Sequence, residues 1–130
     1  MTLTFRKRER MVSQRLIDDL FAGGSSHSVA AFPLRAVYKL RERNDHEVPL
    51  QMLISVPKKH FHHAVDRNRV KRQVREAFRQ NKDVLYHAIP DTHRILLAFI
   101  WISDDHHPTA EVAKRVVTLM RRMSENIAKA

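Results

Sequence analysis

Cysteine is absent from this chain of 130 residues. Its absence excludes a disulfide-stapled scaffold, a thiolate zinc site and a thiol nucleophile, and it fits a reducing compartment. Long apolar runs are also missing: the longest, residues 95–102, has the length of a strand, whereas a membrane helix needs about 18 apolar residues. The basic first ten residues lead into no hydrophobic signal segment. We therefore expect a cytoplasmic protein with no membrane partner.

Acidic residues are scarce relative to basic ones. Fourteen Asp and Glu stand against 24 Lys and Arg, which gives a formal net charge of +10. The chain is nevertheless 43% hydrophobic, too apolar for a disordered basic tail, and it is long enough to bury one core. We expect residues 1–130 to form a single domain whose partner is a polyanion and not a small-molecule substrate.

The positive charge is concentrated in two segments. Residues 58–82 contain nine Lys and Arg and two acids, and residues 1–16 contain five Lys and Arg and one acid. The rest of the chain is close to neutral. A surface that serves only solubility mixes both signs. The concentration of one sign therefore predicts a face that binds phosphates.

The spacing of apolar residues predicts the secondary structure. The expected elements are a helix at 13–22 ended by Gly23 and Gly24, a short strand at 28–31, strands at 32–40 and 50–56 joined by a polar hairpin loop at 41–47, a helix from an Asp66 cap to 82 or 85, a buried central strand at 94–102 and a helix that starts at Pro108. This order is typical of an α+β fold with two layers.

The strand at 32–40 alternates between two kinds of side chain. Leu34, Ala36 and Tyr38 would share one face with Leu40, and Arg35, Val37 and Lys39 would lie on the other. In the last helix, apolar residues recur at helical spacing at Val112, Val116, Leu119, Met120, Met123 and Ile127. Both patterns predict elements that cover one core.

The helix that follows Asp66 has two chemically different sides. Val70, Val74, Ala77 and Phe78 fall together, with Leu85 if the helix extends that far. The opposite side carries Asn68, Lys71, Arg72, Arg75, Arg79 and Lys82, with Glu76 near its edge. Like charges three and four residues apart destabilise a helix, so a function is the better explanation than a generic basic surface. Guanidinium groups suit phosphate oxygens, and an amide can reach a sugar or a base edge.

Three runs of residues around this helix form a dense pattern. They are Ser-Val-Pro-Lys-Lys at residues 55–59, Ala-Val-Asp-Arg-Asn-Arg-Val-Lys-Arg at residues 64–72 and Arg-Glu-Ala-Phe-Arg at residues 75–79. In type and spacing they resemble the signature of the bacterial ribonuclease P protein subunit. The chain departs from the family pattern in the His-Phe-His-His link at residues 60–63 and in Ile17, where the family commonly has an aromatic residue.

The resemblance implies a fold of order αβββαβα, with a mixed, mostly antiparallel four-stranded sheet and a left-handed βαβ crossover, against the usual right-handed rule. It implies two partners, the catalytic ribonuclease P RNA and precursor tRNA. The RNA with Mg²⁺ would hydrolyse the phosphodiester that frees the 5′ leader, which makes the assembly a hydrolytic endonuclease. This chain would be its accessory subunit, with no catalytic side chain and no metal ligands of its own.

The resemblance and the charge pattern together predict the site residues. RNA-binding residues would be Lys58, Lys59, Arg67, Asn68, Arg69, Lys71, Arg72, Arg75 and Arg79. A cleft between the sheet, the first helix and the basic helix would hold the single-stranded leader. Its candidate residues are Phe21, Arg35, Val37, Lys39 and Ser55, with Phe21 equally able to be a core residue.

Other functions have weaker support in the sequence. The nine histidines do not show the spacing of a zinc site, and the pairs Asp18-Asp19 and Asp104-Asp105 do not form the clustered carboxylates of a two-metal nuclease. A DNA-binding helix-turn-helix is disfavoured because a strand precedes the basic helix. The alternative that stays open is a ribosomal or other small structural RNA-binding protein, which would share the charge and the size.

Overall fold

The computed structural model describes residues 9–11, 13–22 and 24–129. The elements are α1 (Gln14–Ala22), β1 (His27–Ala31), β2 (Leu34–Glu42), β3 (Leu50–Ser55), α2 (Ala64–Asn81), the short α3 (Asp83–Tyr86), β4 (His93–Trp101) and α4 (Thr109–Lys129). Apart from the single turn of α3, this is the expected order αβββαβα. The short strand expected at 28–31 is confirmed as β1.

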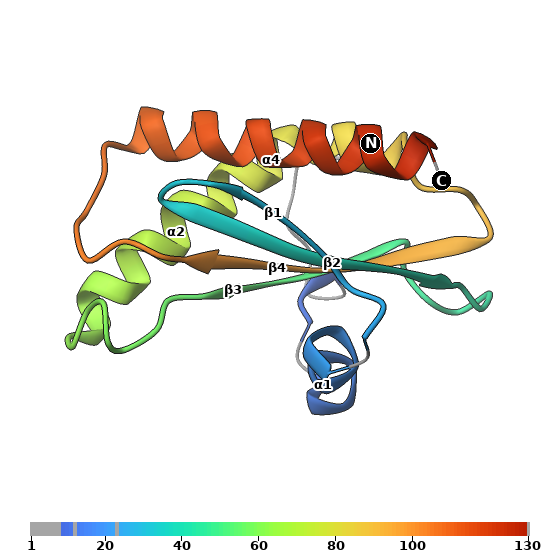
Figure 1. The fold of residues 1–130 in the computed structure, drawn as a ribbon, viewed down its shortest axis with the longest axis horizontal. Coiled ribbons are helices and arrows are strands. Elements are labelled where there is room, and N and C mark those ends of the chain that lie inside the picture. Colours follow the sequence, from blue (N-terminus) through green and yellow to red (C-terminus); the bar gives the residue numbers. More distant parts are fainter. Residues whose placement is uncertain (1–8, 12, 23, 130) are drawn as a thin grey trace.

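The four strands form one mixed sheet in the order β1-β2-β4-β3 (Figure 1). β1 pairs antiparallel with β2, β2 pairs antiparallel with β4, and β3 pairs parallel with β4. The predicted hairpin between the strands at 32–40 and 50–56 is wrong, because β4 lies between β2 and β3. The nearly all-apolar β4 takes a central place, where neighbours on both sides satisfy its backbone and most of its side chains on both faces are buried. The hand of the β3–α2–β4 crossover stays a prediction.

One face of the sheet carries the main core. Figure 1 shows α2 and α4 together on this face. Leu34, Ala36 and Tyr38 of β2 contribute to it, as the alternation predicted. The predicted apolar residues of α4 are all buried there, from Val112 to Ile127. Val70, Val74, Ala77 and Phe78 of α2 are buried as well.

The opposite face of the sheet carries α1 and a smaller core (Figure 1). Leu20 of α1 packs with Val37 of β2 and with Leu96 and Ala98 of β4. An ion pair adds to this contact, because Lys39 Nζ lies 3.0 Å from the carboxylate of Asp19. The α1 helix therefore covers part of this face, and within the described part of the chain no other helix covers the rest of it.

The start of α2 differs from the prediction. His63 is the N-cap residue and makes no side-chain capping hydrogen bond. Asp66 lies within the first turn, and its carboxylate contacts His106 Nε2 at 3.1 Å. The predicted Asp66 cap is therefore wrong, although its negative charge still favours the positive end of the helix dipole. No helix among the described residues is long and apolar enough to cross a membrane.

Candidate nucleic-acid interface

The outward side of α2 presents cations that the fold itself does not use. Arg69 and Arg72 are exposed, while Lys71 and Arg75 are half-buried along the helix. Among the described residues, these four side chains have no carboxylate partner and no hydrogen bond. The same is true of Lys58 and Lys59, in the loop that leads from β3 to α2, and of the amide of Asn68. Unpaired charges on a rigid helix are free to contact phosphates.

Arg67 lies at the start of the same helix but has a different environment. Its Nη1 donates hydrogen bonds to the carbonyl oxygens of Phe61 at 2.8 Å and His62 at 2.9 Å. These contacts tie the loop between β3 and α2 to the first turn of the helix. The predicted RNA-binding role of Arg67 stays a prediction, but the structure adds a role in holding that loop.

Two cations at the end of α2 are paired. Arg79 Nε donates to Glu76 at 3.1 Å, and this hydrogen bond lowers the pKa of the Glu76 carboxyl. Lys82 was expected on the exposed basic side, and that expectation is wrong: the residue is 3% exposed. Its ammonium group lies 2.9 Å from the Glu9 carboxylate, a partner from the start of the chain that the helical pattern does not reveal.

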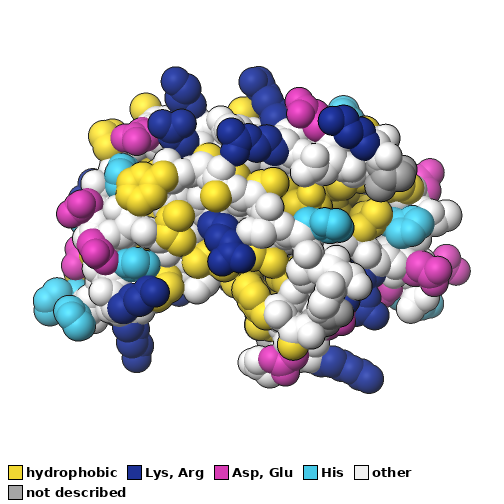
Figure 2. Space-filling view, viewed as in Figure 1, with side chains coloured by type: hydrophobic (Ala, Val, Ile, Leu, Met, Phe, Trp, Pro, Cys, Tyr) yellow, Lys and Arg dark blue, Asp and Glu magenta, His cyan; other side chains and the backbone are white. Residues whose placement is uncertain are grey.

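A strip of the sheet remains open beside α1. Arg35 of β2 and Ser55 of β3 are both in register with Ile100 of β4, and by strand alternation all three lie on the α1 face. A hollow of about 300 Å³ lies at this strip and is lined by Leu20, Phe21, Ser26, His27, Ser28, Arg35, Val37 and Ile100. In the space-filling view, the surface is hollowed between α1 and the segment that leads into α2 (Figure 2).

The structure thus brings together part of the predicted cleft. Phe21, Arg35 and Val37 line one hollow, and Phe21 is 49% exposed, which separates it from the core. Val37 is largely buried beneath α1. Lys39 is held by Asp19 and does not line the hollow. Ser55 belongs to the same strip of sheet but lies at its β3 end.

A second hollow lies between β3, α2 and the segment that precedes α1. It measures about 300 Å³ and is lined by Arg10, Met11, Met52, Leu53, Ile54, Lys71 and Arg75. The sequence indicated Lys71 and Arg75 but not Arg10 as a member of the same site. The only available signal was the positive charge of residues 1–16, which does not reveal which of its cations approaches α2.

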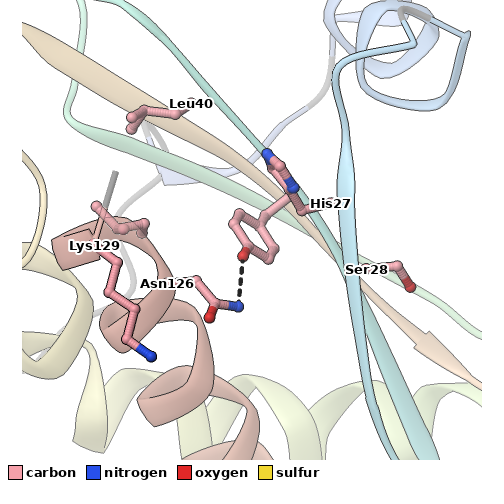
Figure 3. Close-up of a pocket in the computed structure, with 7 residues that line it drawn as sticks. His27, Ser28, Leu40, Asn126 and Lys129 are labelled. Carbon is pink, nitrogen blue, oxygen red and sulfur yellow. Dashed lines mark hydrogen bonds between the residues drawn. The ribbon is translucent and has the colours of Figure 1, made fainter.

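The other face of the sheet has a hollow of different character. It measures about 370 Å³ and lies between β1, β2 and the end of α4 (Figure 3). Asn126 Nδ2 donates to the Tyr38 hydroxyl at 3.1 Å inside it, and of the residues that the structure describes Lys129 is the only lysine or arginine that lines it. The hollow beside α1 and the hollow between β3 and α2 together hold more positive charge, with Arg35 in the first and Arg10, Lys71 and Arg75 in the second, so these two fit a polyanion better.

The histidine-rich segments connect two loops. His60 Nδ1 lies 2.6 Å from the Asp104 carboxylate, and the His106 ring stacks on Phe61 with centroids 4.4 Å apart. His62 and His63 are exposed. These contacts join the loop before α2 to the loop before α4. Across the described part of the chain, no group of three or more His, Asp or Glu side chains is arranged to hold a metal ion.

A basic helix beside the edge of a mixed sheet, with a strip of that sheet left open by the described residues, defines a small nucleic-acid-binding protein of the α+β class. Residues 5–124 match the family described as Ribonuclease P. The chain belongs to the ribonuclease P protein family. It is 36% identical over 128 residues to the ribonuclease P protein component of Porphyromonas gingivalis, covering 97% of this chain and 90% of that protein. It is 31% identical over 129 residues to that of Stutzerimonas stutzeri, covering 99% and 90%.

Solved structures show the same fold. The RNase P protein from Thermotoga maritima superposes with a TM-score of 0.66 at 23% identity, over 88% of this chain and 96% of that one. The RNase P protein from Staphylococcus aureus superposes with a TM-score of 0.65 at 21% identity, over 88% and 94%. The expected fold class and family are thereby confirmed.

Proposed function

We propose that this chain is the protein subunit of ribonuclease P and acts in the cytoplasm. In this role it binds the catalytic RNA and the 5′ leader of precursor tRNA, and it assists the Mg²⁺-dependent endonucleolytic removal of the leader. Membership of the family supports the general role. The specific role is carried by one observation: unpaired cations of α2 line a hollow at the β3 edge of the sheet, next to the strip that the described residues leave open beside α1.

The start of α2 and the loop before it would bind the catalytic RNA. Lys58, Lys59, Arg69 and Arg72 are exposed and lie within 15 residues of sequence. Arginine forks form paired hydrogen bonds with phosphate oxygens, and exposed lysines add charge without demanding a defined geometry. Such contacts supply affinity that does not depend on base sequence.

The strip beside α1 would hold the leader as a single strand. An extended strand needs cations for its phosphates and apolar or aromatic surface for its bases. Arg35 supplies the first, and the half-exposed ring of Phe21 supplies the second. The strip ends at Ser55, three residues before Lys58, so a bound strand could pass from the sheet toward the basic loop. This mode of binding suits a subunit that serves many different leaders.

Chemistry at the scissile bond would belong to the RNA partner. A hydrolytic metal site built by protein side chains needs clustered carboxylates, and the described residues offer no such group. We therefore assign Mg²⁺ to the phosphates of the two RNA molecules. The cations of this chain would reduce the repulsion between those RNA molecules and so help them to align.

Reconstitution tests this proposal. The full chain is mixed with a bacterial ribonuclease P RNA at low Mg²⁺, and cleavage of precursor tRNA at the 5′ end of the mature sequence is followed over time. We expect faster cleavage with the protein than without it. An absence of stimulation, together with tight binding to ribosomal RNA, would instead favour a structural ribosomal protein.

A further inference from the structure

Glu9 is the one acidic residue in the basic segment at residues 1–16, and it is buried. It is 4% exposed, and its carboxylate lies 2.9 Å and 3.1 Å from Lys82 Nζ. The Tyr86 hydroxyl donates to the same carboxylate at 2.5 Å. Burial and this hydrogen bond raise the pKa of Tyr86, so the hydroxyl stays protonated and continues to donate. Hydrogen bonds thus hold Glu9 to Lys82, at the α2–α3 junction, and to Tyr86, at the end of α3, both more than 70 residues away in sequence.

Burial of this ion pair has a cost that a purely structural role does not explain. Both charged groups lose water, and an apolar pair of similar size stabilises a fold as well or better. Buried ion pairs are best known for fixing one alignment of two segments over others. The segments aligned here are the chain before α1 and the far end of α2.

The residue after Glu9 shows what the alignment achieves. Arg10 forms an isolated parallel bridge with Met52, on the free edge of β3, and Met11 donates its backbone N–H to the Met52 carbonyl oxygen at 3.0 Å. Met11 is buried in the smaller core. Arg10 is exposed and lines the hollow that Lys71 and Arg75 of α2 also line. Contacts on both sides of Arg10 therefore hold its backbone beside the basic helix.

We propose that Glu9 is a positioning residue, whose pairing with Lys82 and Tyr86 places Arg10 opposite Lys71 and Arg75 to form a three-cation pocket for a backbone phosphate of RNA. The proposal rests on the proposed function and adds to it a further RNA contact, Arg10. A hollow of about 300 Å³ with three cations and an apolar floor of Met52 and Ile54 fits one phosphate and the sugar attached to it.

The proposal predicts that loss of the Glu9 carboxylate changes RNA affinity in the direction opposite to the change that net charge alone would cause. Removing a carboxylate from a basic protein raises its positive charge and should strengthen RNA binding. If Glu9 positions Arg10, Glu9→Gln should instead weaken binding, because the phosphate pocket loses its alignment. The matched control is Glu47→Gln, which makes the same charge change and breaks the ion pair with Arg94, outside the pocket.

The experiment measures binding of a fluorescent single-stranded leader RNA to the full-length chain by anisotropy across a salt series. The salt slope is the slope of the logarithm of the binding constant against the logarithm of the salt concentration. We expect Arg10→Ala and Glu9→Gln each to lower the magnitude of this slope by about one phosphate contact. The double variant should lose little more RNA affinity than either single variant. Arg10→Lys should keep the slope, and Glu47→Gln should keep the slope and bind at least as tightly as the parent, because it adds net positive charge without touching the pocket. Thermal unfolding confirms that each variant is folded.

A folded Glu9→Gln protein that binds as tightly as the parent, with the same salt slope, would overturn the proposal. If Glu9→Gln does not fold, the exchanged pair Glu9→Lys with Lys82→Glu replaces it, and this variant should restore the parental slope. A folded exchange variant whose slope stays low would also overturn the proposal. Failure of the parent chain to bind leader RNA or to stimulate the catalytic RNA would refute the proposed function itself, whereas indifference to Glu9→Gln in an active parent refutes only this inference.

Discussion

The guanidinium group of Arg67 lies within hydrogen-bonding distance of the backbone of Phe61, with 2.8 Å between Nη1 and the carbonyl oxygen. A second hydrogen bond reaches His62 at 2.9 Å. The Arg67 side chain therefore stabilises the fold, whereas the side chains of Asn68 and Arg69 are exposed and have no partner among the described residues. This difference separates residues of the Arg-Asn-Arg motif that charge alone would treat as equivalent.

Arg67→Ala and Arg69→Ala should accordingly behave differently. Arg67→Ala removes two charge-assisted hydrogen bonds to the loop before α2 and should lower the free energy of unfolding by about 2 kcal/mol. Arg69→Ala removes an exposed side chain with no partner in the described chain and should change stability by less than about 0.5 kcal/mol. Chemical denaturation of the two variants measures the difference, and equal losses of stability would contradict the assignment.

Arg72→Ala should weaken RNA binding without regard to sequence. Arg72 is exposed on α2 and has no partner among the described residues, so its loss should not alter stability. Removal of one phosphate contact should lower the salt slope by about one and weaken all leaders by a similar factor. Dissociation constants for several leader sequences over a salt series test this expectation. A strong dependence on leader sequence would indicate base recognition instead.

Phe21→Ala should lower the affinity for RNA and leave the stability of the fold almost unchanged. The ring is half-exposed at the hollow beside α1, so its loss should cost the fold little. If a leader base stacks on it, affinity for single-stranded RNA should fall by about 1–3 kcal/mol. The neighbouring Leu20→Ala is the matched control: Leu20 is fully buried, and its loss should cost about 2–5 kcal/mol of stability. A Phe21→Ala protein with unchanged RNA affinity would remove Phe21 from the site.

The contact between α1 and the sheet should depend on pH through Asp19. The hydrogen bond from Lys39 and the charges of Arg41 and Lys39 lower the pKa of the Asp19 carboxyl below its ordinary value of 3.8. Because the folded pKa is the lower one, the stabilisation is present above pH 3.8 and is lost as the pH falls through the lowered value. The difference in unfolding midpoint between the parent and Asp19→Asn should be constant from pH 7 to 5 and shrink below pH 4. A difference that persists unchanged at pH 3 would contradict this.

Local pattern predicted most of the elements correctly. The apolar run at 94–102 predicted the buried central strand β4, because only a strand covered on both faces tolerates such a run. The spacing from Val112 to Ile127 predicted the buried side of α4. The alternation along β2 predicted which residues face α2 and α4 and which face α1.

Contacts distant in sequence could not be predicted in the same way. The hairpin expected between β2 and β3 failed because β4, which comes some 40 residues after β3 begins, inserts between them. The helical spacing placed Lys82 on the exposed basic side of the helix, because nothing near Lys82 in the sequence reveals that Glu9 is its partner. For the same reason the sequence indicated Lys71 and Arg75 but missed Arg10 beside them.

The absence of cysteine makes the central claim directly measurable, because a single introduced thiol can carry a photo-crosslinker at a chosen position. Ser55→Cys places the crosslinker at the β3 end of the open strip, and Lys114→Cys places it on the exposed side of α4. With catalytic RNA and precursor tRNA present, we expect Ser55→Cys to crosslink the 5′ leader and Lys114→Cys not to do so. Leader crosslinks from Lys114→Cys, with none from Ser55→Cys, would contradict the account.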